Sequence, residues 1–188
     1  ADLPGAVSRV LGFGEYILFL IGDAQTVYVS DLSTATAVTA TSYFSAESFY
    51  DNITSGVIAA NLLYLFGTNT TEIFYNSGAQ VVPFDRVSNG AVNYGIIGAN
   101  AVCVAGNQAY SLARDANGII GLITWQGPQP QIIPNRSLNE KLKDYTQIDD
   151  VYMWVDNHNG HQFVNMTFPH KTDWDSATHT YDLTTGMW

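Results

Sequence analysis

Asn61-Leu-Leu-Tyr-Leu-Phe66 and Thr71-Glu-Ile-Phe-Tyr75 are two short apolar and aromatic runs, and Gly67-Thr-Asn-Thr70 separates them. β-Branched and aromatic residues are enriched in strands, because they pack well on a pleated, half-buried surface. A short glycine-containing stretch between two such runs is typical of a hairpin turn. This segment therefore predicts an antiparallel β-hairpin.

The same pattern occurs three more times, and the paired runs are 16–21 with 25–29, 101–105 with 108–112, and 162–168 with 179–182. The four first strands begin near residues 16, 61, 101 and 162, which gives steps of 45, 40 and 61 residues. The first two steps match the roughly 40–50-residue period of propeller blades. The sequence therefore predicts an all-β fold made of β-propeller-like, repeated antiparallel hairpins or blades. A β-sandwich is the other architecture that such hairpins build, and the repeat favours the propeller.

One short helix is expected near residues 137–144, inside the longest step. Ser137-Leu-Asn-Glu140 has the pattern of a capping box, and Leu138, Leu142 and Tyr145 recur at helical spacing. A second helical turn is expected around 45–47. We expect residues 1–188 to form a single propeller-like domain. The chain stops within a run that resembles a strand after a turn, so we expect a fragment of a longer chain.

Composition excludes several classes of protein. The chain has 7 basic and 17 acidic residues, a net charge of −10, and 13% aromatic residues. Disordered chains are poor in aromatic residues, and the longest apolar run, 16–21, is far shorter than the ~20 residues of a membrane-spanning helix. A nucleic-acid-binding surface needs clustered Lys and Arg, which this chain lacks. We therefore expect no direct DNA binding and no membrane insertion.

Histidine and acidic residues are the first candidates for chemistry. His158-Asn-Gly-His161 could hold a metal only with further ligands, for which His170 and His179 are the remaining histidines, and its composition favours a turn. Asp149 and Asp150 would point to opposite faces of a strand. The other acidic candidates are Glu72, at the start of a strand, and Asp173 and Asp175, which flank Trp174. Acidic residues at loop tips are typical of a solvated surface, so no catalytic, cofactor-binding or metal-ligating residue is assigned.

Four tryptophans could form a sugar-binding platform: Trp125, Trp154, Trp174 and Trp188. Trp154 lies in the alternating run 151–155 and is expected in the core, whereas Trp125 and Trp174 lie near loops and remain open. Cys103 is the single cysteine and lies in an apolar run, which favours a small buried hydrophobic side chain over a reactive thiol.

Several blocks together resemble the packaged-DNA stabilisation proteins of short-tailed bacteriophages, which are also called tail-hub or head-completion proteins. The blocks are 61–78, Val82-Pro-Phe-Asp-Arg86, 90–95, Ile132-Ile-Pro-Asn-Arg-Ser-Leu138, Gly160-His-Gln-Phe163, Thr167-Phe-Pro169 and Thr180-Tyr-Asp-Leu-Thr-Thr-Gly-Met-Trp188. Their order and approximate spacing are kept over residues 44–188, and the first forty residues match only loosely.

The resemblance implies a β-propeller-like subunit of the virion that is assembled in the bacterial cytoplasm. Such a subunit self-associates in a ring below the phage portal and adaptor ring, retains the genome, and carries the tail needle and tail spike proteins. The family has no catalytic residues and no cofactor to carry over, so the chain is not expected to be an enzyme. A carbohydrate-binding or carbohydrate-active propeller and a protein-interaction propeller remain the alternatives at this stage.

Overall fold

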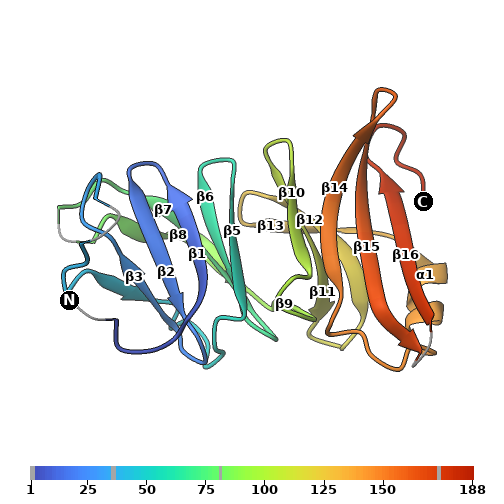
Figure 1. Cartoon of the computed structure of the whole chain (residues 1–188), viewed down its shortest axis with the longest axis horizontal. Coiled ribbons are helices and arrows are strands. Elements are labelled where there is room, and N and C mark those ends of the chain that lie inside the picture. The colour runs from blue at the N-terminus through green and yellow to red at the C-terminus, as the bar shows by residue number, and fades with distance from the viewer. Residues whose placement is uncertain (1–2, 35–36, 81, 173–174) are drawn as a thin grey trace.

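The computed structural model describes residues 3–34, 37–80, 82–172 and 175–188. Within them, sixteen strands form four antiparallel sheets that follow one another along the chain, and there is one helix (Figure 1). Sheet A consists of β1 (Val7–Phe13), β2 (Tyr16–Ile21), β3 (Thr26–Val29) and β4 (Tyr43–Ser45). Sheet B consists of β5 (Ser55–Ala59), β6 (Leu62–Phe66), β7 (Thr71–Asn76) and β8 (Phe84–Val92). The described chain is therefore all-β apart from one helix, as predicted.

The other two sheets follow the same up-and-down order. Sheet C consists of β9 (Tyr94–Ile96), β10 (Val102–Ala105), β11 (Gln108–Asp115), β12 (Ile120–Gln126) and β13 (Gln129–Ile133). Sheet D consists of β14 (Tyr152–His158), β15 (His161–Thr172) and β16 (Asp175–Asp182). In sheet C, β9 and β10 both pair with β11, at its end and at its beginning respectively. These two short strands together act as one interrupted first strand.

All four predicted hairpins are present, but the third is β10–β11, which lies one strand earlier in its sheet than the other three hairpins lie in theirs. The second strands of the sheets, β2, β6, β11 and β15, begin at residues 16, 62, 108 and 161, so the true steps are 46, 46 and 53 residues. The predicted third unit began at residue 101, which lies beside β10, part of the interrupted first strand. The four predicted strands are therefore present, but β10 is not the equivalent of β2, β6 and β15, and the steps between equivalent strands are more regular than the predicted ones.

The sheets stack face to face, and their first strands β1, β5, β10 and β14 lie next to one another in that order. Sheet A and sheet D lie at opposite ends of the long axis of the molecule (Figure 1). One hydrophobic cluster fills the space between sheets A and B, and it includes Leu18, Leu20, Val27, Leu63 and Leu65. A second, larger cluster joins sheets B, C and D. This is the face-to-face stacking of propeller blades, which bury their apolar faces against their neighbours.

The helix α1 (Arg136–Leu142) lies in the connection between sheets C and D. Leu138 and Leu142 are buried, as their spacing predicted. The predicted capping box was wrong, because Asn135 is the N-cap and its side-chain oxygen accepts the N–H of Leu138 at 2.9 Å. The predicted helical turn around 45–47 was also wrong, since Ser45 ends strand β4.

Asp51 holds the turn between β6 and β7 from outside sheet B. Its carboxylate accepts the N–H groups of Thr68, Asn69 and Thr70 and both threonine hydroxyls, at 2.8–3.2 Å. Gly67 makes room for it, because a Cβ there would lie 2.1 Å from the Asp51 Oδ2. Burial alone would raise the pKa of Asp51, but the hydrogen bonds from Asn69, Thr70 and Thr68 outweigh burial and lower it.

The same turn also meets the next sheet at Gly95 in β9. A Cβ at Gly95 would lie 2.1 Å from the Thr68 carbonyl carbon and 2.2 Å from the Asn69 nitrogen, both backbone atoms. The N–H of Ile96 donates to the Gly67 carbonyl at 3.0 Å, so the two backbones touch directly. The Asp51-held turn thereby fixes the position of sheet C relative to sheet B.

We expect Asp51→Asn to lower the free energy of unfolding by about 2 kcal/mol at pH 7, because hydrogen bonds to a charged acceptor are lost. The lowered pKa stabilises the folded protein above the ordinary aspartate pKa of 3.8. That contribution disappears as the pH falls through the lowered value. Urea unfolding at pH 7 and at acid pH measures both effects, with the exposed Asp85→Asn as control. A pH-independent difference between Asp51→Asn and the unaltered protein would contradict this assignment.

Gly95→Ala should destabilise the fold by about 3 kcal/mol or more, because the new Cβ collides with backbone that cannot rotate away. Gly12→Ala in β1 is the matched control, since a Cβ there meets nothing within 4 Å. Thermal unfolding of both variants tests the contact. Equal melting temperatures for the two variants would show that sheets B and C do not touch at this turn.

Candidate functional site

Glu72 is buried and paired, so it is not a free catalytic acid. Only 3% of its side chain is exposed, and its Oε2 lies 2.7 Å from the Nε of Arg86 on the neighbouring strand β8. Its Oε1 accepts the N–H of Ser48 at 2.7 Å. The Arg86 guanidinium also lies 5.6 Å from the ring centre of Phe74. Glu72 thus links β7 to β8 through Arg86, and to the connection from sheet A through Ser48.

The other predicted acidic residues do not converge on one site. Asp149 is exposed, whereas the Oδ2 of Asp150 lies 2.5 Å from the Nδ1 of His170. Asp175 pairs with Lys171 at 2.8 Å on the surface. Asp173 lies outside the described residues. Asp150 and Asp175 thus each have a partner near them, and neither contacts the other acidic candidates.

The histidine pair forms a tight turn. His158 and His161 close the β14–β15 hairpin, and Asn159 and Gly160 between them both have positive φ, 49° and 80°. This is the geometry of a two-residue hairpin loop, as the composition predicted. The Nδ1 of His161 lies 2.7 Å from the Asp182 Oδ2.

The remaining histidine, His179, contacts a tyrosine. Its Nε2 lies 2.6 Å from the Tyr145 hydroxyl. Burial, together with nearby Lys141 and Lys171, lowers the pKa of His179. Within the described residues, no three His, Cys, Asp or Glu side chains are placed to hold a metal ion.

Two tryptophans lie where the sequence did not place them. Trp125 is in the core, 2% exposed, and its Nε1 donates to the Ser111 hydroxyl at 2.8 Å. Trp154 was expected in the core, and that prediction was wrong, because its side chain is 42% exposed. The alternation of the run 151–155 is real, but Val151 and Met153 point into the core and Tyr152 and Trp154 point out. Trp188 is 40% exposed and packs against Tyr181, and Trp174 lies outside the described residues.

The thiol of Cys103 is half-buried in strand β10. Burial raises the pKa of Cys103 to about 12. A thiol with this pKa is almost entirely protonated near neutral pH, and the thiolate is the nucleophilic form. The raised pKa and partial burial of Cys103 agree with the packing role that the sequence favours.

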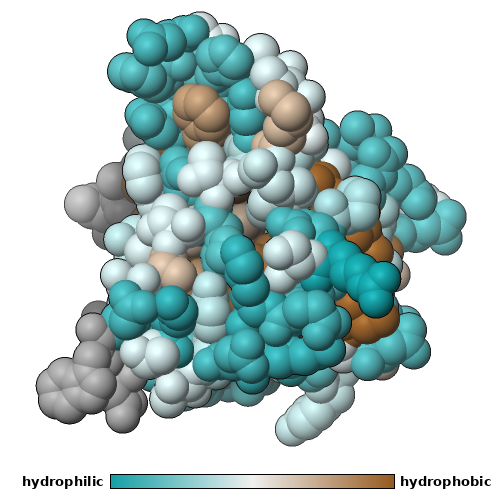
Figure 2. Space-filling model, turned by 90° about the vertical axis from the view of Figure 1, so that its right-hand side faces the viewer, coloured by the Kyte–Doolittle hydropathy of each residue, from teal (hydrophilic) through white to brown (hydrophobic). Residues whose placement is uncertain are grey.

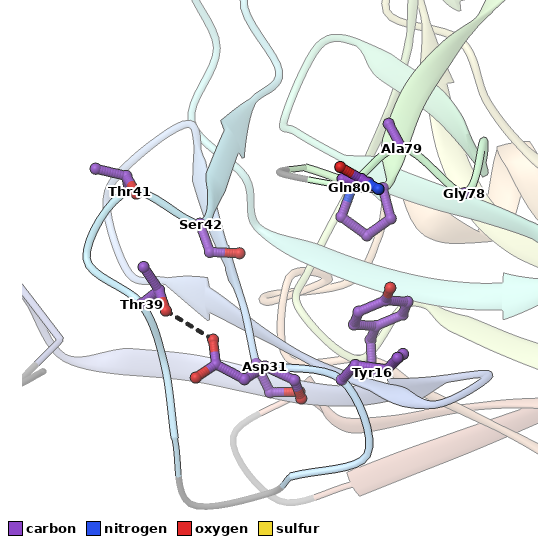
Figure 3. Close-up of a pocket in the computed structure, with 11 residues that line it drawn as sticks. Tyr16, Asp31, Thr39, Thr41, Ser42, Gly78, Ala79 and Gln80 are labelled. Atoms are coloured by element: carbon purple, nitrogen blue, oxygen red, sulfur yellow. Dashed lines mark hydrogen bonds between the residues drawn. The ribbon is translucent and has the colours of Figure 1, made fainter.

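One hollow of about 520 Å³ lies between sheet A and the β7–β8 loop (Figure 3). Tyr16, Asp31 and Ser42 line one side, and Gly78 and Gln80 line the other. The single carboxylate, Asp31, accepts the Thr39 hydroxyl at 2.8 Å. The described lining residues contain no histidine, cysteine, lysine or second carboxylate, so they supply no acid–base pair.

The two ends of the stack of sheets differ in chemistry. The outer face of sheet A carries a row of Val10, Phe19, Tyr28 and Tyr43, one residue from each strand in register. We call these four residues the sheet A row. Val10 is 55% and Tyr43 46% exposed, and the rings of Tyr28 and Tyr43 lie 5.3 Å apart. The end formed by sheet D is mostly hydrophilic or neutral (Figure 2).

The state of Cys103 can be measured with a thiol reagent. At pH 8 its thiolate fraction should be about 1,000-fold below that of an ordinary cysteine with a pKa of 9. We therefore expect 5,5′-dithiobis(2-nitrobenzoic acid) to react with the native chain at least ~100-fold more slowly than with the urea-unfolded chain. Equal rates in the two states would mean that Cys103 is an accessible thiolate.

Comparisons with known proteins identify the family. A family model described as "Bacteriophage P22 Gp10, beta-propeller" matches residues 4–188, so the match also covers residues 4–40, where the sequence blocks gave only a loose resemblance. No curated protein matches the chain. Among solved structures, the N-terminal domain of Nup159 is similar with a TM-score of 0.49 and 14% identity. That similarity covers 97% of this chain and 45% of the other, so the chain spans less than half the length of that structure.

The described chain contains no helix long and apolar enough to cross a membrane. Its stacked antiparallel sheets have the architecture that the family description names. The chain belongs to the phage stabilisation family of bacteriophage P22 Gp10 and has that family's β-propeller fold.

Proposed function

We propose that this chain is part of the tail hub, or connector, that closes the phage portal after genome packaging and anchors tail spikes or the tail needle. The observation that carries the proposal is the family match over residues 4–188. In this role the chain works by assembly in the virion. Its partners are the portal and adaptor ring above, the needle and spike proteins below, and other copies of itself in a ring.

The charge of the chain supports retention of the genome by mechanical closure, without direct binding to DNA. The net charge is −10, which repels a duplex. Several basic side chains are already used within the chain. Arg9 donates to the Ala99 carbonyl and to Asn100, and Lys143 and Lys171 pair with Glu140 and Asp175. With Arg86 paired to Glu72, four of the seven basic side chains have partners other than phosphate.

The sheet A row supports self-association. Copies that each carry a charge of −10 repel one another, so a permanent contact between them needs a surface without charge. The row has no charged side chain, and it presents aromatic residues, which are enriched at the centres of protein interfaces. We therefore assign this row to the contact between copies in the ring.

Val10→Asp should prevent ring formation and lower the yield of DNA-retaining heads about tenfold or more, because it places a charge in the contact. The experiment adds the full-length protein to portal-bearing phage heads that lack it, and counts heads that keep their DNA. Sedimentation velocity of the same proteins measures the ring.

Ile132→Asp is the matched control, since Ile132 is 53% exposed on sheet C and should tolerate the charge. Normal assembly of the Val10→Asp protein would show that the sheet A row is not part of the contact between copies. Failure of the unaltered full-length protein to join heads, or hydrolysis of a glycan by it, would overturn the proposed function itself.

A further inference from the structure

The outer face of sheet D has an unusual composition. Two rows cross it in register, Tyr152–Thr167–Thr178 and Trp154–Asn165–Thr180. We call these six residues the Trp154 face. Tyr152 is 44% and Trp154 42% exposed, the three threonine side chains carry hydroxyls, and Asn165 is buried, only 5% exposed. Two aromatic rings thus lie beside a strip of uncharged hydrogen-bonding groups.

Hydrogen bonds between strands hold the Trp154 face in one arrangement. The Trp154 Nε1 donates to the Thr167 hydroxyl at 3.2 Å, so the indole reaches diagonally from β14 onto β15. The Thr167 and Thr178 hydroxyls lie 3.0 Å apart, and the Thr180 hydroxyl donates to the Asn165 Oδ1 at 2.7 Å. A ring that is already fixed in position loses little conformational entropy when a ligand binds.

The Trp154 face differs from the faces that the sheets bury against one another. The contact between sheets A and B consists of residues such as Leu18, Leu20 and Leu65, and the inner face of sheet D carries Met166 and Phe168. The threonine hydroxyls of this face would have to give up water in such a contact. The end view shows mainly hydrophilic and neutral residues (Figure 2). The face is therefore suited to a polar ligand.

We propose that the Trp154 face binds a neutral oligosaccharide. The C–H face of a pyranose ring stacks on an aromatic ring, and the sugar hydroxyls exchange hydrogen bonds with the threonine side chains. Tyr152 and Trp154 are two residues apart on one strand, roughly 7 Å, so they contact successive sugar units. None of the six residues is charged, and the net charge of −10 disfavours an anionic glycan.

The neighbouring row on this face carries two carboxylates. Asp156, Phe163 and Asp182 form the next row on this face, with the two carboxylates on outer strands. Burial alone would raise the pKa of Asp182, but hydrogen bonds from Thr185, His161 and Thr184 lower it to about 2. The Asp182 carboxylate is thus occupied by contacts within the chain, and binding alone is assigned to this face.

The test uses the purified chain with three neutral probes: maltoheptaose, cellohexaose and chitohexaose. At least one should bind in isothermal titration calorimetry and change the tryptophan fluorescence. Trp154→Ala should weaken that binding at least ~10-fold, and Thr167→Val, which keeps the ring but releases its N–H, should weaken it several-fold. Tyr75→Ala on sheet B is the control, because Tyr75 is 40% exposed and lies outside the face.

Circular dichroism melting of each variant establishes that it is folded. Thr167→Val serves as the deciding variant if Trp154→Ala does not fold. No binding of any probe at about 10 mM would overturn the proposal. Binding by both Trp154→Ala and Thr167→Val that is as tight as binding by the unaltered chain would also overturn it. A change in oligomeric state of Trp154→Ala without any sugar binding would assign the face to a protein contact and equally overturn it. The experiment needs no phage heads, so its result is independent of the proposed function.

Discussion

Burial of apolar sheet faces against neighbouring sheets is the interaction on which this structure depends. No single sheet of three to five short strands encloses its own apolar face, so each sheet is stable only where the next one covers it. Leu18 and Leu20 of sheet A need Leu63 and Leu65 of sheet B, and the same relation repeats through sheets C and D. Close backbone contact follows from it. Gly67 and Gly95 allow the Asp51-held turn and strand β9 to meet without intervening side chains.

Most of the fold could be predicted from the sequence because the signals were local. The four hairpins and the helix follow from apolar runs, glycine turns and the spacing of Leu138 and Leu142, and each of these acts within a few residues. The interrupted strand β9–β10 could not be predicted, since the pairing of both parts with β11 depends on tertiary contact. The helix start was misjudged because Ser137 and Asn135 are both good N-cap residues, and the geometry chose Asn135.

The surfaces were harder to predict than the fold. Alternation in the run 151–155 indicates two faces but not which of them is buried, and a shift of one residue exchanges them. For this reason Trp154 was assigned to the core, although it lies on the outer face. Asp51 gave no signal beyond one acidic residue in a connection, because its partners at 68–70 are distant in sequence. A Thr-Asn-Thr turn preceded by glycine is the signal that could have suggested an acceptor for its N–H groups.

Sheet B has a position that no other sheet shares. Leu63, Leu65 and Phe74 on one of its faces belong to the cluster with sheet A, whereas Tyr64, Phe66 and Ile73 on the other belong to the cluster with sheets C and D. Neighbouring residues of a single strand thus join two otherwise separate cores. Sheet A contacts the rest of the molecule mainly through sheet B, and Arg9 of β1 adds a second connection through its hydrogen bonds to Ala99 and Asn100, just before β10. A displacement of sheet A would therefore be transmitted mainly through sheet B, whose strands β5 and β6 are five residues long.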